Sequence, residues 1–417
     1  MSKIVIAGGN KLEGEIKVSG AKNTVLPILA ATLLNGGKNI IHDCPDLKDV
    51  SASLQILERL GCKIQRQGKT IIVDSSSIKD YQIPDHLMRE MRSSMIFLGS
   101  IIARCRKAIL SYPGGCEIGP RPIDLHLKAL RQLGVKTSEA HGYIYCDVDR
   151  LEANDINLRF PSVGATENTM LAAVLAKGTT IIRNVAKEPE IVDLQDYLNA
   201  MGAKISGAGT SVIKIEGVSK LHDVEHTVIP DRIVTSTYLA AAAITGGTVK
   251  VTNTNPENLQ AVLAELRECG CEIYLEKNAI TLSRPSVLQP VDVIRTLPYP
   301  GFPTDVQALM MAVLTLAKGT SIISETIFEN RFKHVEELIR MGADIMVDGR
   351  VAVIRGVEKL TGANVNAMDL RGGAALVIAG LAAEGVTIVE GVQHIDRGYE
   401  NIEDKLASLG ADIKRVD

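Results

Sequence analysis

An internal repeat constrains the fold of this chain more than any other feature of its sequence. After each of six helix-like runs, a hydrophobic residue or cysteine is followed by a glycine and another small or apolar residue. The glycines are Gly61, Gly134, Gly202, Gly270, Gly342 and Gly410, at spacings of 73, 68, 68, 72 and 68 residues. This regularity predicts six copies of one structural unit of about 70 residues.

A second motif lies between these turns, where an alanine-rich helical run stops at a glycine and a β-branched run follows. Its five copies read NGGKNIIHD, AKGTTIIRN, TGGTVKVTN, AKGTSIISE and AEGVTIVEG. Glycine can adopt the left-handed conformation that ends a helix, and Thr, Ile and Val favour strands. Each unit is therefore predicted to run helix, strand, helix, strand, strand, which indicates a mixed α/β fold.

Six repeats divide naturally into two groups of three, which predicts two domains. The tract HTVIPDRIV, residues 226–234, lies between the third and fourth turns, and we place a chain crossover there. The N-terminal run KIVIAGG has no helix of its own, so it is expected to complete the second domain. The expected domains are residues 22–230, which include the cysteine-bearing loop described below, and residues 1–21 together with 231–417.

Charge and aromatic content exclude nucleic acid as a partner. The 417 residues include 46 Lys and Arg against 49 Asp and Glu, no Trp, 9 Tyr and 5 Phe. Nucleic-acid binding depends on a basic surface and on aromatic stacking platforms, and neither is expected here. Any anion site must be built from locally placed cations.

Membrane insertion, metal binding and bound cofactors find no support in the motifs. The longest apolar runs, such as residues 308–317, are far shorter than the ~18 to 20 residues of a spanning helix. No signal-peptide core follows the N-terminus and seven cysteines are dispersed along the chain, so a cytoplasmic protein with free thiols is expected. CxxC, HExxH, GxGxxG and GxxxxGKS/T motifs are all absent, which predicts neither metal nor cofactor.

The most unusual segment surrounds Cys116. Residues 112–122, YPGGCEIGPRP, hold three Gly and three Pro around one Cys and one Arg, a composition that tolerates neither a helix nor a continuous strand. An exposed thiol near Arg121 is expected to be reactive, because a nearby cation lowers a thiol pKa from its usual ~8.5. A buried cysteine in a turn is the alternative. The other six cysteines fall in or beside helix and strand patterns and are expected to be small core residues.

Basic residues near predicted helix starts form a second group of candidates. Lys22 and Asn23 precede the apolar run VLPILAATLL, and a helix N-terminus with a lysine suits an anion. A solvated first-turn lysine is the alternative. Four arginines near predicted helices could join such a site or make surface ion pairs, namely Arg92, Arg331, Arg371 and Arg397.

Asp305 ends the Pro/Gly loop PGFPTD and opens the helical run VQALMMAVLTLA. From position alone, its expected role is to cap that helix. A role as a base needs a second indication, so both roles stay open at this point.

Motifs spread over both halves carry a resemblance to a known family. They are SGAKN, MRSS, PGGCEIGPRPIDLH, SVGATEN, KEPEIVDL, PDRI, PGFPTD, ETIFENRF, DLRGGAAL and HIDRGYENIEDKL. With these motifs the whole chain resembles the UDP-N-acetylglucosamine 1-carboxyvinyltransferases, which are enolpyruvyl transferases. The resemblance implies a two-domain inverted α/β barrel built from six βαβαββ repeats, three in each domain.

The resemblance also implies a reaction between two small-molecule substrates. The carboxyvinyl group of phosphoenolpyruvate would pass to the 3′-hydroxyl of UDP-N-acetylglucosamine with release of phosphate, by addition and elimination, in the first committed step of peptidoglycan synthesis. Cys116 is expected to be the general acid and the target of fosfomycin, Asp305 to take the hydroxyl proton, and Lys22 to act beside them.

The implied binding residues come from many segments. For phosphoenolpyruvate they are Lys22, Asn23, Arg121, Arg331, Arg371 and Arg397. For UDP-N-acetylglucosamine they are Asn23, Arg92, Arg121, Pro122, Ile123, Asp124, Leu125, Ser162, Val163, Gly164, Asp305 and Ile327, with Asp369 elsewhere in the same site.

One position departs from the family pattern, and two other functions compete. Phe160 stands where relatives carry a lysine near the nucleotide phosphates, so diphosphate contacts are expected to be fewer or to come from elsewhere. The first rival is 3-phosphoshikimate 1-carboxyvinyltransferase, which shares the fold but lacks the PGGC loop. The second is a silent paralogue that binds the sugar nucleotide as a sensor, which the joint retention of Cys116, Lys22 and Asp305 disfavours.

Overall fold

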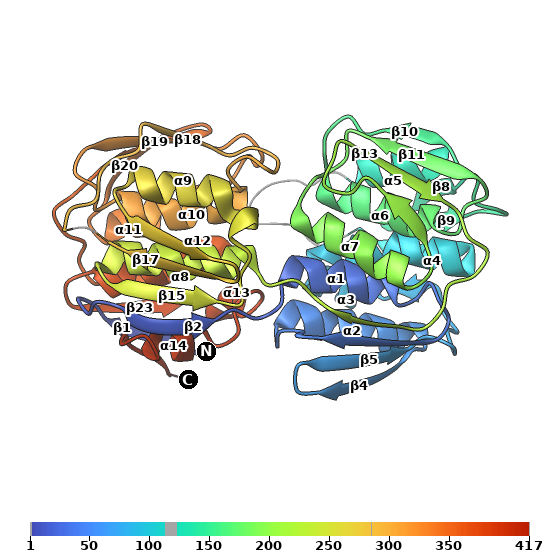
Figure 1. Cartoon of the computed structure of the whole chain (residues 1–417), viewed down its shortest axis with the longest axis horizontal. Coiled ribbons are helices and arrows are strands. Elements are labelled where there is room, and N and C mark those ends of the chain that lie inside the picture. Colours follow the sequence, from blue (N-terminus) through green and yellow to red (C-terminus); the bar gives the residue numbers. More distant parts are fainter. Residues whose placement is uncertain (1, 113–122, 285, 417) are drawn as a thin grey trace. The chain divides into compact units, whose positions relative to one another are not determined.

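The structure is a computed structural model that describes residues 2–112, 123–284 and 286–416. The chain forms two compact units, shown in Figure 1. The first unit comprises the described residues within 20–229, and the second comprises those within 2–19 and 230–416. The chain passes from the first unit to the second between Ile229 and Pro230, inside the tract 226–234.

Three four-stranded sheets make up the strands of the first unit. In spatial order they are β14 (Val224–Thr227), β3 (Lys38–His42), β5 (Thr70–Asp74) and β4 (Lys63–Gln67); β6 (Gln82–Ile83), β7 (Lys107–Ser111), β9 (Tyr143–Asp147) and β8 (Lys136–Ala140); and β10 (Asp155–Asn157), β11 (Thr179–Arg183), β13 (Val212–Glu216) and β12 (Lys204–Ser206). Its helices are α1 (Lys22–Ala31), α2 (Lys48–Leu60), α3 (Asp85–Glu90), η1 (Arg92–Ile96), α4 (Phe97–Cys105), α5 (Asp124–Gln132), α6 (Val163–Ala173) and α7 (Pro189–Ala200).

The second unit has three sheets of the same kind. They are β2 (Glu13–Lys17), β15 (Thr248–Thr252), β17 (Ala279–Ser283) and β16 (Glu272–Glu276); β18 (Val293–Arg295), β19 (Thr320–Ser324), β21 (Val351–Arg355) and β20 (Asp344–Asp348); and β22 (Asn364–Asn366), β23 (Val386–Glu390), β1 (Lys3–Ala7) and β24 (Asp412–Val416). Its helices are α8 (Arg232–Thr245), η2 (Pro256–Leu259), α9 (Gln260–Glu268), α10 (Thr304–Leu314), α11 (Val335–Arg340), α12 (Leu370–Ala382), α13 (Val392–Ile395) and α14 (Ile402–Ala407).

All six sheets share one topology, which confirms the predicted six-repeat α/β fold. In each sheet the first two strands in spatial order are parallel, and the remaining neighbours are antiparallel, as in β18, β19, β21 and β20. Along the chain each repeat reads βαβαββ, with helical segments between the first and second strands and between the second and third, and β1 supplies the fourth strand of the last repeat.

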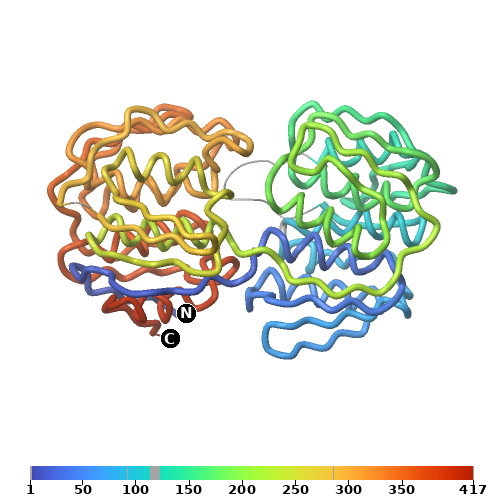
Figure 2. Tube along the Cα trace, viewed as in Figure 1, coloured from blue at the N-terminus to red at the C-terminus, as the bar shows by residue number. Residues whose placement is uncertain are grey.

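Strands remote in sequence complete three of the sheets. β1 lies third in the spatial order of the last sheet, where it pairs antiparallel with β23 and β24 and replaces the second strand of that repeat's hairpin. Figure 2 shows this blue N-terminal strand among the red C-terminal segments. β2 pairs parallel with β15, and β14 pairs parallel with β3. In each case a strand from a distant part of the chain occupies the place that the repeat's own strand holds in the other sheets.

The repeat turns depend on glycine. All six turn glycines have positive φ, from 86° at Gly270 to 105° at Gly61. Side chains with a Cβ rarely adopt this left-handed conformation, whereas glycine does so freely. The recurring glycine is therefore explained by the backbone that each helix-to-strand turn requires.

One set of helices forms the interior of each unit. In the second unit, α8, α10 and α12 pack against one another. Every residue of α10 from Val306 to Leu314 is buried, as expected for a helix that is apolar on all sides. Polar groups can therefore be accommodated chiefly at the ends of these helices.

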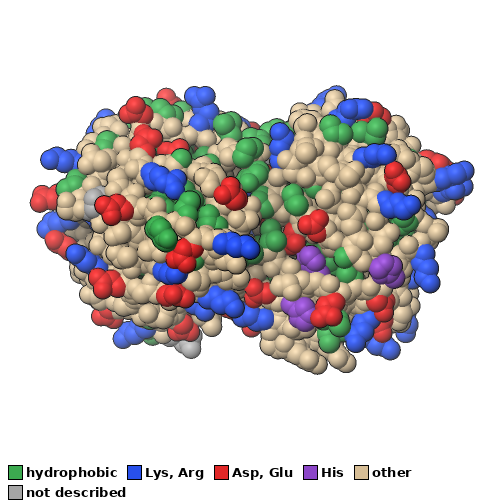
Figure 3. Space-filling view, viewed as in Figure 1, with side chains coloured by type: hydrophobic (Ala, Val, Ile, Leu, Met, Phe, Trp, Pro, Cys, Tyr) green, Lys and Arg blue, Asp and Glu red, His purple; other side chains and the backbone are tan. Residues whose placement is uncertain are grey.

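The distribution of surface charges and the unpaired state of the described cysteines agree with what the composition predicts. Figure 3 shows acidic and basic side chains interspersed over the face in view. Six described cysteines are unpaired, and burial is the main factor that raises the pKa of the thiols of Cys44, Cys62, Cys146 and Cys269 to about 12. Within the described ranges, no helix has the length and apolarity needed to cross a bilayer.

Candidate active site

The predicted site residues of the first unit lie at the starts of helices. Lys22 and Asn23 are the first residues of α1, Arg92 opens η1, and Asp124 opens α5. Orphan backbone N–H groups at such ends favour anions. Cys116, Arg121 and Pro122 lie outside the described residues, and nothing is described of the Arg92 side chain.

Lys22 is buried and ion-paired, so it is not the solvated first-turn lysine that sequence position allowed. Its Nζ lies 2.6 Å from Oδ2 of Asp49, in the first turn of α2. The side chains are only 10% and 3% exposed. Asp49 went unnoticed in the sequence because 26 residues and a strand separate it from Lys22. The pair keeps a cation at the start of α1 without leaving a buried charge uncompensated.

The start of α6 is braced by a polar network that sequence reasoning missed. Ser162 caps α6, its Oγ accepting from the Ala165 N–H at 3.3 Å. His126 of α5 lies against Gly164, where an added Cβ would come within 3.0 Å of the imidazole. The buried Asn168 amide donates to Nδ1 of His126 at 2.8 Å. These contacts join the starts of α5 and α6, where residues 123–125 and 162–164 were predicted to bind the nucleotide.

Three glutamates near α6 form a further group that was not predicted. Glu167 is 6% exposed, and burial, followed by the charges of Glu190 and Glu188, raises its pKa well above the usual range. The neighbouring carboxylates and the loss of solvent both disfavour a negative charge on Glu167.

Asp305 is held between two buried arginines in the second unit. Its Oδ1 lies 2.8 Å from Nη2 of Arg331, and its Oδ2 lies 3.0 Å from Nη2 of Arg371. Both arginine side chains are 4% exposed, whereas the Asp305 side chain is 28% exposed. The expected capping role of Asp305 is wrong, because α10 begins one residue earlier and Pro303 is its N-cap. The Asp305 carboxylate is therefore not the cap of α10.

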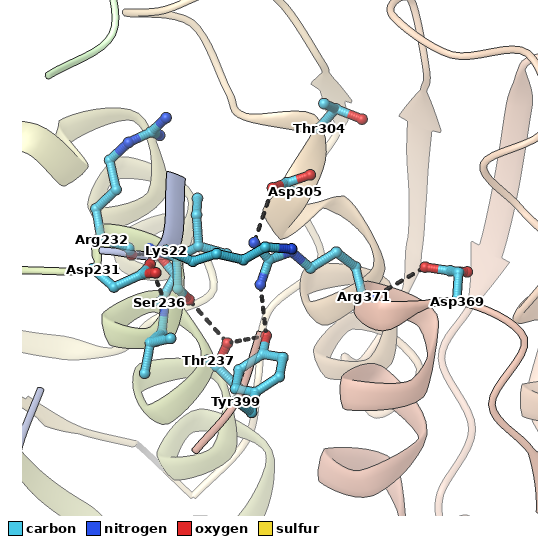
Figure 4. Close-up of polar contacts among 12 residues, drawn as sticks. Lys22, Asp231, Arg232, Ser236, Thr237, Thr304, Asp305, Asp369, Arg371 and Tyr399 are labelled. Carbon is cyan, nitrogen blue, oxygen red and sulfur yellow. Dashed lines mark hydrogen bonds and ion pairs between the residues drawn. The ribbon is translucent and has the colours of Figure 1, made fainter. Parts of the chain in front are cut away.

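Arg371 connects this carboxylate to a buried hydroxyl chain, as Figure 4 shows. Its Nη1 donates to Tyr399 Oη at 3.3 Å, and that hydroxyl lies 2.8 Å from Oγ1 of Thr237 on α8. Burial opposes the charge of Arg371, but Asp305, Tyr399 and Asp231 outweigh it and raise its pKa. Arg371 is a permanently charged group at the N-terminus of α12, where Asp369 caps the helix by accepting from the Arg371 and Gly372 N–H groups at 2.9 and 3.0 Å.

Glu325 organises the loop that carries Ile327. This glutamate is 1% exposed and its Oε1 accepts from Thr296 Oγ1 at 2.9 Å and from the Ile327 and Phe328 N–H groups at 2.8 and 3.0 Å. Its Oε2 accepts from Thr304 Oγ1, one residue before Asp305, at 2.9 Å. One carboxylate therefore fixes both Ile327 and the start of α10.

His334 is a buried histidine that lies next to Arg331. It is 3% exposed, and neither ring nitrogen has a hydrogen-bond partner among the described residues. Burial lowers its pKa to about 4, so the ring is neutral at pH 7. A neutral ring adjoins Arg331 without adding a competing charge.

The second unit thus combines cations with helix N-termini, an arrangement that suits an anionic ligand. Arg331 and Arg371 are both buried, so neither is a surface ion-pairing residue. Arg397 lies in the turn between α13 and α14 and is partly exposed. A guanidinium can hold a carboxylate or phosphate through two N–H groups. Such a ligand would compete with Asp305 for the arginines.

Comparison with known proteins identifies the family. A family model described as EPSP synthase (3-phosphoshikimate 1-carboxyvinyltransferase) matches residues 6–406. The chain belongs to the EPSP synthase family. Among members of this family, a protein of Caldanaerobacter subterraneus named UDP-N-acetylglucosamine 1-carboxyvinyltransferase 2 is 59% identical over 416 residues, covering 100% of both chains. One of Carboxydothermus hydrogenoformans named UDP-N-acetylglucosamine 1-carboxyvinyltransferase 1 is 54% identical, covering 100% of this chain and 99% of the relative.

A solved enolpyruvyl transferase structure shares the fold. The enolpyruvyl transferase NikO of Streptomyces tendae superposes with a TM-score of 0.90 at 26% identity, covering 100% of this chain and 99% of NikO. Within the described parts of this family member, no group of three or more His, Cys, Asp and Glu could hold a metal ion.

Proposed function

We propose that this chain transfers the carboxyvinyl group of phosphoenolpyruvate to the 3′-hydroxyl of UDP-N-acetylglucosamine and releases phosphate. The observation that carries the proposal is the Asp305 carboxylate between the buried guanidinium groups of Arg331 and Arg371. It combines a proton acceptor with two anion-binding groups, as this reaction requires. Full-length identity of 59% to a protein named for this activity supports the choice of substrates.

The reaction needs one proton donor and one acceptor. In the addition step, C3 of phosphoenolpyruvate takes a proton from Cys116, C2 bonds to the sugar 3′-oxygen, and the hydroxyl proton passes to Asp305. In the elimination step, C3 returns a proton to the Cys116 thiolate while the bond from C2 to the phosphate oxygen breaks, which restores the double bond, and the proton held by Asp305 leaves with the released phosphate. Each positioned acid or base contributes roughly 10²- to 10⁴-fold.

Cationic residues would bind the anionic substrates. We assign phosphoenolpyruvate to Lys22, Asn23, Arg121, Arg331, Arg371 and Arg397. We assign the sugar nucleotide to Asn23, Arg92, residues 121–125 and 162–164, Asp305 and Ile327, with Asp369 acting through the α12 cap. Because the phosphoenolpyruvate carboxylate would compete for Arg331 and Arg371, substrate binding would release Asp305 from its ion pairs and let it accept a proton.

The proposed role places the enzyme at the first committed step of peptidoglycan synthesis, in the cytoplasm. The six unpaired cysteines among the described residues are consistent with a reducing compartment. The choice of acceptor separates this proposal from its nearest rival. Phosphate release from phosphoenolpyruvate should depend on UDP-N-acetylglucosamine and should be negligible with shikimate 3-phosphate, and the reverse preference would overturn the proposal.

Phe160 offers a test of the nucleotide assignment. This side chain is 44% exposed, two residues before the α6 cap Ser162. Phe160→Lys is expected to lower KM for UDP-N-acetylglucosamine about fivefold at low salt, because a cation there gains a charge-assisted contact with the diphosphate. The gain should fade as salt screens it. Phe160→Met is the matched control without charge, and equal KM values for the two variants would place the diphosphate elsewhere.

A further inference from the structure

The turn that carries Arg397 is held from the C-terminal strand. It links α13 to α14 and contains Asp396, Arg397, Gly398 and Tyr399. Its main chain is held by hydrogen bonds from the Gly398 and Tyr399 N–H groups to Ile395 O at 3.0 and 3.1 Å, whereas the direction of its side chains also depends on contacts from outside the turn. An arginine that binds a small anion needs its guanidinium placed closely.

Arg415 of β24 makes four hydrogen bonds to two carboxylates that flank this turn. Its Nη1 and Nη2 donate to Oδ2 and Oδ1 of Asp396 at 3.1 and 2.8 Å. Its Nε and Nη2 donate to Oε1 and Oε2 of Glu403 at 2.6 and 3.1 Å. Asp396 immediately precedes Arg397, and Glu403 lies in the first turn of α14. One guanidinium therefore ties the residue before Arg397 to the helix that follows.

The contacts are shielded from water. The Arg415 side chain is 26% exposed, while Asp396 and Glu403 are 20% and 8% exposed. Two carboxylates this close would repel one another without a shared cation. Arg415 itself lies in a paired strand, with Ile4 of β1 opposite it in the ladder, so the turn is anchored to the sheet.

The other end of the turn is fixed independently. Tyr399 is 3% exposed and is hydrogen-bonded to Thr237 and Arg371. Gly398 packs so closely on Leu370 at the start of α12 that an added Cβ would come within 2.7 Å of its side chain. Arg397 is thus bracketed by Asp396 on one side and by a packed Gly398–Tyr399 segment on the other.

We propose that Arg415 is a positioning residue for Arg397, acting through Asp396 and Glu403 to hold the turn in the geometry that binds the anion of phosphoenolpyruvate. This inference rests on the proposed function. Arg415 does not itself bind substrate; it acts only through the turn. A lysine could keep the charge but could not reproduce the two forked contacts, because its ammonium is a single point of donation.

A double-mutant cycle tests this dependence. Arg415→Ala is expected to raise KM for phosphoenolpyruvate about tenfold, with KM for UDP-N-acetylglucosamine changed less than about twofold. In an Arg397→Ala background the same substitution should have no further effect on phosphoenolpyruvate, since the group it positions is gone. Arg415→Lys, a variant that is safer for folding, should give an intermediate KM, and thermal melting reports the stability of each variant.

The control is Arg355→Ala, which removes another strand arginine paired to a carboxylate in the same unit. Arg355 Nη1 lies 3.3 Å from Oδ1 of Asp344, and both side chains are more than half exposed. Its KM values should match those of the wild type. A general loss of stability would instead lower the melting temperature without favouring one substrate.

The outcomes separate the inference from the proposed function. An active wild type with an unchanged KM for phosphoenolpyruvate in both Arg415 variants would overturn the positioning role alone. Multiplicative effects of Arg397→Ala and Arg415→Ala would also overturn it, because they would show independent action. A wild type without turnover on the two substrates would overturn the proposed function and this inference together.

Discussion

Replacing Asp305 by asparagine should lower kcat by about 10²- to 10⁴-fold while leaving UDP-N-acetylglucosamine bound. The amide keeps the shape of the side chain and can still accept a hydrogen bond from Arg331 or Arg371, but it cannot take up the hydroxyl proton. A base contributes more to proton removal than to ground-state affinity, so kcat should fall more than KM changes. Steady-state kinetics and calorimetric titration with the sugar nucleotide measure the two effects.

Stability must be measured on the same protein. Asp305 is ion-paired with two buried arginines, and weakening those pairs lowers the melting temperature whether or not Asp305 is a base. Asp344→Asn is the control, since it loses an exposed ion pair with Arg355 in the same unit. Near-normal kcat in Asp305→Asn, with a lowered melting temperature, would show that the carboxylate is only structural.

Replacing Cys116 by serine should lower kcat by a comparable factor, about 10²- to 10⁴-fold, because a hydroxyl is a far weaker acid than a thiol. The wild type should be modified by fosfomycin, an epoxide phosphonate, and Cys116→Ser should not. Cys116→Asp, which keeps a group able to donate a proton, should retain turnover and resist the drug.

The pKa values of the other thiols predict that fosfomycin modifies Cys116 selectively. Thiolate is the reactive form, and burial is the main factor that raises the pKa of Cys44 and Cys62 to about 12 and of Cys271 to about 11. These side chains should therefore be unreactive at neutral pH. Peptide mapping after labelling should find the adduct on Cys116, and an adduct on Cys62 or Cys269 would contradict the assignment.

The repeats made the fold predictable, because each depends on local chemistry. A turn that needs positive φ selects glycine, and six such turns at regular spacing indicate six units. The pairing of strands from distant parts of the chain was harder to predict from the sequence. That β1 closes the last sheet beside β24 depends on pairing between the two ends of the chain, and the sequence showed only that the first strand lacked a helix of its own.

The site could be predicted only as a set of separate residues. Lys22, Asp305, Arg331 and Arg371 were recognised from motifs, but the ion pairs that they make were not. Asp305 meets residues 26 and 66 positions away, and no local pattern encodes such a meeting. Glu325 and Arg415 were missed for a similar reason, because each acts through loops brought to it by the tertiary fold. The ETIFEN motif around Glu325 was the one available signal.

The cleavage of labelled phosphoenolpyruvate tests the central claim, transfer of the carboxyvinyl group, most directly. The substrate would carry ¹⁸O in the oxygen that bridges C2 and phosphorus, and turnover with UDP-N-acetylglucosamine would be followed by ³¹P NMR and mass spectrometry. Carboxyvinyl transfer breaks the C2–O bond, so the label should appear in the released phosphate and the sugar nucleotide should gain the three-carbon unit on its 3′-oxygen. Unlabelled phosphate, with ¹⁸O retained in pyruvate or in a three-carbon product, would show that the P–O bond breaks and would contradict the account.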